Sequence, residues 1–120
     1  MGRPILLVED DMDSRQMLAL ILQSRGHEVV TATNGMEAFN LACHHLPAVI
    51  LLDLMMPIMS GEEFRQAQLE NATIKKIPVV VISAHHDAPR IAKRMKAAGC
   101  LRKPVDFDAL LQMAGAMTQA

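Results

Sequence analysis

Acidic, hydroxyl and amine side chains follow four of the short apolar runs in this sequence, and their types could perform phosphoryl chemistry. They are Glu9, Asp10, Asp53, Ser83 and Lys103. Carboxylates that share a small site repel one another unless a proton or a cation lies between them, and Mg²⁺ prefers carboxylate oxygen and water. A lysine and a hydroxyl can stabilise phosphoryl oxygens. A carboxylate among them can be the nucleophile, and the position of Asp53 favours that role.

The apolar runs predict five strands, and the segments between them predict five helices. The runs span residues 5–8, 28–32, 48–52, 79–82 and 100–102. Three of them are almost entirely apolar, which is typical of strands covered on both faces. A repeated strand–helix unit predicts an α/β fold. We expect a flavodoxin-like doubly wound parallel sheet of order 2-1-3-4-5 with helices on both faces.

Start and stop residues delimit the expected helices. The first ends at Gly26, the second begins at Asn34, the third follows Gly61, the fourth has Pro89 in its first turn, and the last follows Asp106. Apolar residues at helical spacing are expected to face the core: Met17, Leu18, Ile21, Leu22, Phe39, Ala42, Cys43, Phe64, Ala67, Ile91, Met95, Ala98, Phe107, Leu110, Leu111 and Ala114.

The chemically useful residues are expected to meet at one edge of this sheet, because ligands bind beyond the carboxyl ends of parallel strands. A single acid there is more often a loop residue or a helix cap, and Asp11 or Asp13 could simply cap the first helix. Suitable residues after four different strands favour a shared site over that simpler interpretation.

Composition argues against several other classes of function. The 120 residues carry a net charge of −1, with no Trp, no Tyr and three Phe, so nucleic-acid binding is not expected. No signal-peptide layout or membrane-length apolar run is present, which predicts a cytoplasmic chain without membrane contact. Cys43 and Cys100 lack metal-ligand spacing and are interpreted as small apolar residues. Residues 1–120 are predicted to form one domain.

Four sequence blocks resemble the signature of response-regulator receiver domains of two-component signalling, of the chemotaxis-regulator type. The blocks are ILLVEDD, LLDLMMPIMSG, VVVISA and KP, in the family's order over essentially the whole chain. The resemblance implies that Asp53 accepts a phosphoryl group from a histidine kinase or a histidine phosphotransfer protein. It also implies a signalling module that turns over no external substrate.

The resemblance further implies Mg²⁺ as the cofactor. Asp10 and Asp53 would bind it directly, Glu9 through a water molecule, and Met55 through its backbone carbonyl. Phosphorylation would change the surface formed by the fourth helix, the fifth strand and the fifth helix, where a downstream effector would bind.

The resemblance also implies roles for two more residues. Ser83 matches the switch hydroxyl that turns toward the phosphoryl group. Lys103, whose bond to Pro104 is expected to be cis, would pair with the phosphoryl oxygens.

The segment GCLRKP departs from the family pattern. It is shorter than usual between Gly99 and Lys103 and lacks the aromatic residue of the family, with Cys100 or Leu101 near that place. This departure leaves open the alternative that the chain is a pseudo-receiver, or a phosphate sink or relay, with an altered output surface. A small hydrolase or flavin-binding domain of the same architecture is disfavoured, because Met55 stands where an aspartyl phosphatase needs a second acid.

Two other groups of residues have simpler interpretations. The pairs His44-His45 and His85-His86 lack zinc spacing and are expected to be surface residues whose side chains point apart, although His85 could modulate the lifetime of a phosphoryl group. The fourth helix is basic and is either a solvated face or a docking surface for an acidic partner. Its basic residues are Arg90, Lys93, Arg94 and Lys96.

Overall fold

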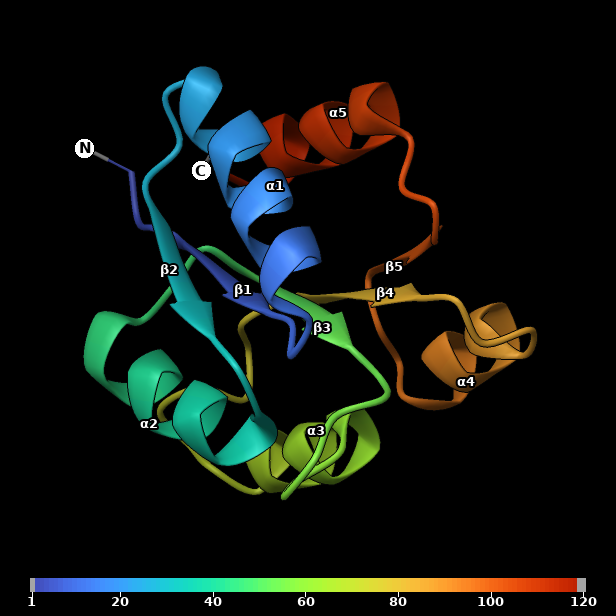
Figure 1. The fold of residues 1–120 in the computed structure, drawn as a ribbon. Helices are drawn as coiled ribbons and strands as arrows, with labels where there is room; N and C mark the ends of the chain where they lie inside the picture. Colours follow the sequence, from blue (N-terminus) through green and yellow to red (C-terminus); the bar gives the residue numbers. More distant parts are fainter. Residues whose placement is uncertain (1, 119–120) are drawn as a thin grey trace.

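The structure, a computed structural model, describes residues 2–118 and contains a sheet of five parallel strands, drawn as arrows in Figure 1. The strands are β1 (Ile5–Val8), β2 (Val29–Ala32), β3 (Val49–Asp53), β4 (Val79–Ser83) and β5 (Gly99–Arg102). Their order is β2-β1-β3-β4-β5, and every neighbouring pair is parallel. The predicted fold and strand order are therefore confirmed.

Five helices cover the two faces of the sheet. They are α1 (Met12–Ser24), α2 (Gly35–His45), α3 (Gly61–Leu69), α4 (Ala88–Arg94) and α5 (Phe107–Thr118). Helices α1 and α5 pack together on one face, and α2, α3 and α4 cover the other (Figure 1). Among the helices of residues 2–118, none has both the length and the apolar character needed to cross a membrane.

The strands supply alternate side chains to two separate cores. In β1, Leu6 and Val8 face the core under α2, α3 and α4, whereas Ile5 and Leu7 face the core under α1 and α5. All residues of β1, β3 and β4 are buried, while β2 and β5 form the half-buried edges of the sheet. Burial on both faces explains why three runs in the sequence are almost uninterrupted.

Helix α4 is shorter than predicted. It ends at Arg94, Lys96 has a positive φ of 58°, and the amide of Ala98 donates to the carbonyl of Val79 at the start of β4. The expectation that Ala98 lies on the inner face of this helix is therefore wrong. The left-handed residue ends the helix, and Ala98 already belongs to the approach to the sheet.

Met17 and Phe107 also differ from the prediction that they face the core. They are 50% and 43% exposed. Both line an apolar cavity of about 190 Å³ between α1 and the segment that precedes α5, together with Lys103 and Pro104. They lie beside the core under α1 and α5 rather than in it.

Side-chain caps begin three helices directly after loops at the carboxyl edge of the sheet. Asp11 accepts the amide of Ser14 at the start of α1, and Asn34 accepts the amide of Glu37 at the start of α2. Ser60 forms a reciprocal capping box at the start of α3. These caps fix where each loop ends and thereby limit the freedom of the residues at this edge.

Candidate functional site

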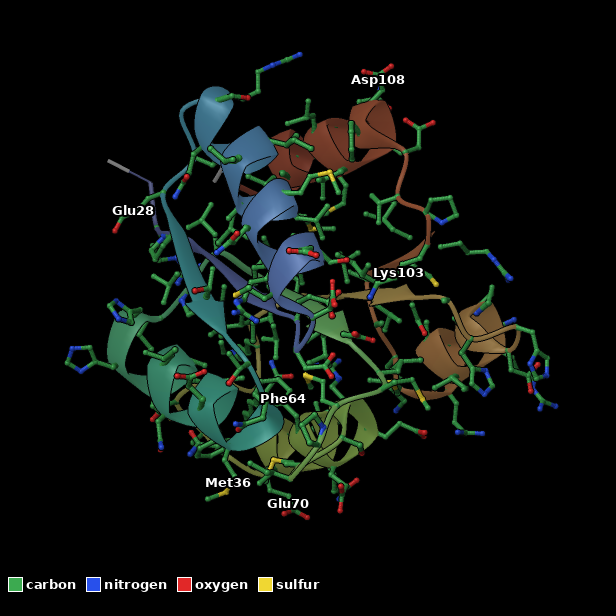
Figure 2. All side chains as sticks on the ribbon, in the orientation of Figure 1. Glu28, Met36, Phe64, Glu70, Lys103 and Asp108 are labelled. Atoms are coloured by element: carbon green, nitrogen blue, oxygen red, sulfur yellow. The ribbon has the colours of Figure 1, made fainter. Side chains whose placement is uncertain are left out.

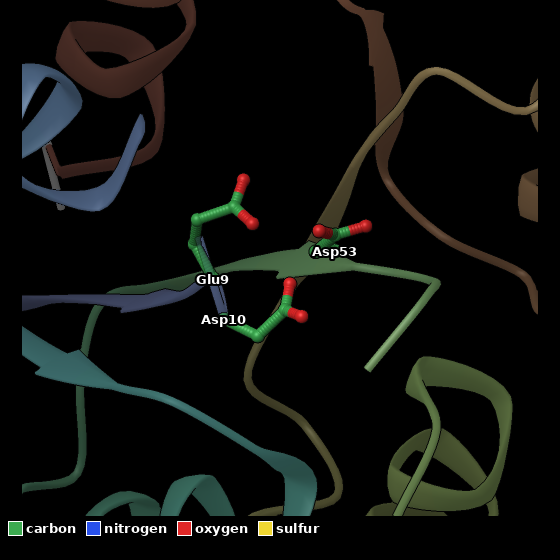
Figure 3. A group of neighbouring side chains, drawn as sticks. All are labelled: Glu9, Asp10 and Asp53. Carbon is green, nitrogen blue, oxygen red and sulfur yellow. The ribbon is translucent and has the colours of Figure 1, made fainter. Parts of the chain in front are cut away.

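Three carboxyl groups gather at the ends of β1 and β3 (Figure 3). Glu9, Asp10 and Asp53 each place an oxygen within 4.8 Å of the others. The pairing of Val8 with Leu52 explains this, because Glu9 and Asp53 are the residues that follow this pair on adjacent strands. Glu9 and Asp53 are 1% and 5% exposed, whereas Asp10 faces solvent. We call these three residues the acid cluster.

Lys103 extends from the end of β5 into the acid cluster (Figure 2). Its Nζ lies 2.5 Å from Oε1 of Glu9 and 3.3 Å from Oδ2 of Asp53. Burial by itself would lower the pKa of the Lys103 amine, but the ion pair with Glu9 and the charge of Asp53 outweigh burial and raise it. The amine therefore stays protonated at neutral pH and supplies a positive charge to the site.

One lysine does not compensate the buried charge of Glu9. Oε2 of Glu9 accepts the amide of Asp11 at 3.2 Å. Oε1 of Glu9 lies beside the Lys103 amine, but no group among residues 2–118 donates to it with good hydrogen-bond geometry. Burial and then the neighbouring Asp53 raise the pKa of Glu9, and the contacts with Lys103 and Asp11 only partly oppose them. Three carboxyl groups that share a single lysine amine, two of them buried, fit a hard divalent cation.

The loop after β3 holds Asp53 through its backbone. Oδ1 of Asp53 accepts the amide of Met55 at 3.1 Å. The first residue of α3, Gly61, donates its amide to Leu54 at 3.1 Å, and a Cβ there would lie 2.7 Å from the carbonyl oxygen of Asp53. Only glycine permits this approach, so the start of α3 is packed directly against the backbone of the acid.

Ser83 ends β4 next to the acid cluster. The pairing of Asp53 with Ile82 places Ser83 one residue further toward the same edge, where it is fully buried. Its Oγ accepts the amide of His85 at 3.1 Å, and its carbonyl accepts the amide of Lys103 at 3.0 Å. The ends of β4 and β5 are thus joined at the site, and the bond from Lys103 to Pro104 is cis, as the resemblance implied.

The sequence profile described as the response regulator receiver domain matches residues 5–115. The chain belongs to this family of receiver domains. Members of the family are signalling modules that act between kinases and effectors rather than enzymes with a substrate of their own.

The receiver domain is similar to known proteins over nearly its whole length. It is 31% identical to Protein PilH of Pseudomonas aeruginosa over 115 residues, which cover 94% of this chain and 95% of PilH. It is 37% identical to Response regulator Rre1 of Synechocystis over 117 residues, which cover 92% of this chain but half of that relative. The structure of chemotaxis response regulator CheY4 of Vibrio cholerae matches with a TM-score of 0.87 at 31% identity, covering 98% of this chain and 99% of that one.

Two arginines of the receiver domain bind backbone carbonyls in contacts that were not predicted. Arg15 donates from Nη1 to the carbonyl of Glu9 at 2.9 Å and to that of Asp10 at 3.3 Å, so it holds the loop of the two acids. Arg65 donates to the carbonyls of Met95 and Lys96, both at 3.0 Å, although it is 8% exposed. The contact of Arg15 could have been predicted, because Arg15 lies in the first turns of the first expected helix, close in sequence to Glu9 and Asp10. The contacts of Arg65 could not, because its partners lie far away in the sequence.

The paired histidines are only partly as predicted. His44 and His45 are exposed, but their rings meet edge to face at 4.9 Å, and the rings of His85 and His86 stack at 4.7 Å. The prediction that paired side chains point apart is therefore wrong. At the second pair, the amide of Asp87 donates to Nδ1 of His85 and orients its ring. Among residues 2–118, the acid cluster alone has the ligand spacing for a metal.

The two cysteines are free and half buried beside the core under α2, α3 and α4. Burial raises the pKa of the Cys100 thiol. These surroundings match their interpretation as small apolar residues.

Proposed function

We propose that this receiver domain accepts a phosphoryl group on Asp53 from the phosphohistidine of a histidine kinase or a histidine phosphotransfer protein, and that phosphorylation switches a partner-binding surface. One observation carries the proposal. A nearly buried carboxylate has two other acids within 4.8 Å and a lysine amine at 3.3 Å. Such a carboxylate is suited to attack phosphorus while its neighbours neutralise the charge that develops.

The proposed transfer is one displacement at phosphorus. A carboxylate oxygen of Asp53 forms the new O–P bond while the P–N bond to the donor's imidazole breaks, and the nitrogen leaves with that electron pair. The amine of Lys103 is in reach of the oxygens on which negative charge builds. Because Oγ of Ser83 accepts the amide hydrogen of His85, the hydroxyl proton is free to be donated to a phosphoryl oxygen.

The donor set supports Mg²⁺ as the cofactor. Asp10, Asp53 and the backbone carbonyl of Met55 would hold the ion directly, and Glu9 would do so through water. These are the hard oxygen ligands that Mg²⁺ prefers, and the gathering of three carboxyl groups around one lysine amine supports a further positive charge at the site. When bound, the ion would offset the negative charge of the carboxylates and of the phosphoryl group.

We propose that the output surface is formed by α4, β5 and α5. The composition of β5 also favours a second candidate function. β5 carries Cys100 and Leu101 and no aromatic residue. A phosphate sink or a pseudo-receiver with an altered output surface would need no aromatic switch at this strand.

We further propose that residues 1–120 act as one receiver unit in the cytoplasm.

The test compares the wild type with Asp53→Asn. Each is treated with Mg²⁺ and either acetyl phosphate or beryllofluoride, and amide chemical shifts are followed by NMR, because the chain has no Trp or Tyr to report by fluorescence. We expect shifts around the acid cluster and in α4, β5 and α5 of the wild type alone. Equal responses of both proteins would refute the proposal. Absence of Mg²⁺ binding at millimolar concentration would favour the pseudo-receiver instead.

A further inference from the structure

A polar groove of about 250 Å³ lies between α3 and α4, which cover the same face of the sheet (Figure 1). We call it the α3–α4 groove. No residue that lines it belongs to the acid cluster, β5 or α5, so it lies apart from the site at Asp53 and from those two elements. Its lining includes Glu62, Arg65, Leu69, Arg94, Met95 and Lys96.

The wall of the groove contains a buried positive charge that no acid neutralises. Arg65 is 8% exposed, and its guanidinium donates to the carbonyls of Met95 and Lys96 and to the side-chain oxygen of Gln68. These three acceptors are uncharged, and Arg65 forms no ion pair with an acidic side chain among residues 2–118. Burial lowers the pKa of Arg65, and no neighbouring charge opposes that effect. An arginine is rarely buried without a partner of opposite charge.

Arg65 also keeps hydrogen-bond donors for a ligand. A guanidinium carries five N–H groups, and three of those of Arg65 donate to groups among residues 2–118. Two N–H groups therefore remain on a side chain that lines the groove. A carboxylate would supply both the missing negative charge and the acceptor oxygens.

Two further cations lie at the groove, and the local structure does not account for them. Arg94 pairs with Glu62 at 2.7 Å, but both side chains are about half exposed or more, and such a pair contributes little to stability. Lys96 is exposed and has a positive φ, which glycine or asparagine adopts more readily than lysine. The carbonyls after α4 are already bound by Arg65, so neither cation is needed to satisfy them.

We propose that the α3–α4 groove is a docking site for an acidic segment of a partner protein, with one carboxylate of that segment paired with Arg65 and others paired with Arg94 and Lys96. Charge complementarity identifies the partner, because a buried charge without a counter-ion favours a ligand that supplies one. Leu69, which is 43% exposed at the groove, offers a contact for an apolar side chain beside the acids. The docking involves no step at Asp53, so it does not rest on the proposed function.

The experiment follows the binding of a synthetic acidic peptide to the whole chain by NMR at low salt. The probe has eight residues, six glutamates and two leucines, and is blocked at both ends. A peptide with lysine in place of every glutamate is the control for its charge. The Nε–H signal of Arg65 and the amide signals of α3 and α4 report the site. Arg65 itself is kept, because its loss would also destabilise the protein.

Four variants test which charges bind the peptide. Arg94→Gln and Lys96→Gln each remove one positive charge from the groove. Arg25→Gln removes the same charge from the exposed end of α1, on the other face of the sheet, and is the matched control. Glu62→Gln has the opposite effect, because it releases Arg94 from its ion pair and removes the one acid of the groove.

We expect saturable shifts of the Arg65 Nε–H and of the groove amides, with a Kd of about 1 mM or less. Arg94→Gln and Lys96→Gln should each raise the Kd about threefold or more, and Glu62→Gln should lower it about twofold or more. Arg25→Gln should leave the Kd within about twofold of the wild type, and the lysine peptide should produce no shifts at the groove.

Three results would overturn the inference. The first is the absence of saturable shifts at Arg65 and the groove amides of the wild type. The second is an increase in Kd for Arg25→Gln as large as that for the two groove variants, which would show binding to net charge alone. The third is that inorganic phosphate produces the same shifts at the same or lower concentrations, which would indicate a site for small anions rather than for a protein segment.

Discussion

Replacing Asp53 with asparagine removes one negative charge from the acid cluster and keeps the size of the side chain. Without Mg²⁺, Asp53 is attracted by the amine of Lys103 at 3.3 Å and repelled by Glu9 at 4.8 Å or less. With an effective dielectric constant of about 20, the attraction is worth roughly 5 kcal/mol and the repulsion roughly 3.5 kcal/mol. The net attraction is therefore smaller than the several kcal/mol that desolvation of a buried carboxylate costs. The exposed Asp10 adds a screened repulsion. We therefore expect Asp53→Asn to raise the free energy of unfolding by about 2 kcal/mol without Mg²⁺.

The assay is urea denaturation followed by circular dichroism, with and without Mg²⁺. At Mg²⁺ near a hundred times its dissociation constant the wild type should gain about 2.7 kcal/mol. Asp53→Asn, which lacks a proposed ligand, should gain less, so the difference between the two proteins should shrink or reverse. Asp108→Asn, an exposed acid on α5, is the control and should change stability by less than about 0.5 kcal/mol. An Asp53→Asn protein that is less stable than the wild type without Mg²⁺ would refute the charge argument.

Three other substitutions and a change of pH test separate parts of the structure. Gly61→Ala should cost about 1 to 3 kcal/mol and slow phosphorylation by acetyl phosphate, because the new Cβ meets the carbonyl of Asp53 at 2.7 Å. Gly115→Ala in α5, where nothing lies within 4 Å of the new Cβ, should instead stabilise the protein in the same urea assay. Arg65→Met should cost about 3 kcal/mol in urea unfolding, because it leaves two carbonyls near the end of α4 without their charged donor, and an unchanged midpoint would contradict that role. Since the pKa of Glu9 is raised, its contribution to stability is present below its unfolded pKa and is lost as the pH rises through the folded value. Lowering the pH from neutrality toward that raised pKa should therefore stabilise the Mg²⁺-free protein and weaken Mg²⁺ binding, as titration calorimetry at several pH values can check.

The sheet and the position of the acid cluster were predictable from the sequence, because local signals and topology agree there. Strands buried on both faces are nearly uninterrupted apolar runs, and parallel pairing brings their carboxyl ends to one edge. Glu9, Asp53 and Lys103 could thus be grouped although they are far apart in the chain. The proximity is observed, while the roles proposed for these residues depend on the experiments above.

Features that depend on distant partners were not predictable. The carbonyls just after α4 are bound by Arg65, which lies 30 residues before Met95 in the sequence. The helical spacing of Ile91, Met95 and Ala98 gave no sign of that contact. The positive φ of 70° at Ile58 was not predictable either, because the loop between β3 and α3 is held by the packing of Met56 and Met59 against the core and by the amide of Gly35, not by any preference of isoleucine.

The contact of Arg65 with the end of α4 has a consequence for how the protein opens. Helix α4 has seven residues, too few to be stable in isolation, and the carbonyls of Met95 and Lys96 just after it accept hydrogen bonds from the side chain of Arg65 in α3. Helix α3 in turn begins at Gly61, against the backbone of Asp53. Amide hydrogen exchange should therefore reveal α3 and α4 as one cooperative unit, separate from α1 and α5. An opening of that unit would release α4 and the loop at Asp53 in the same event.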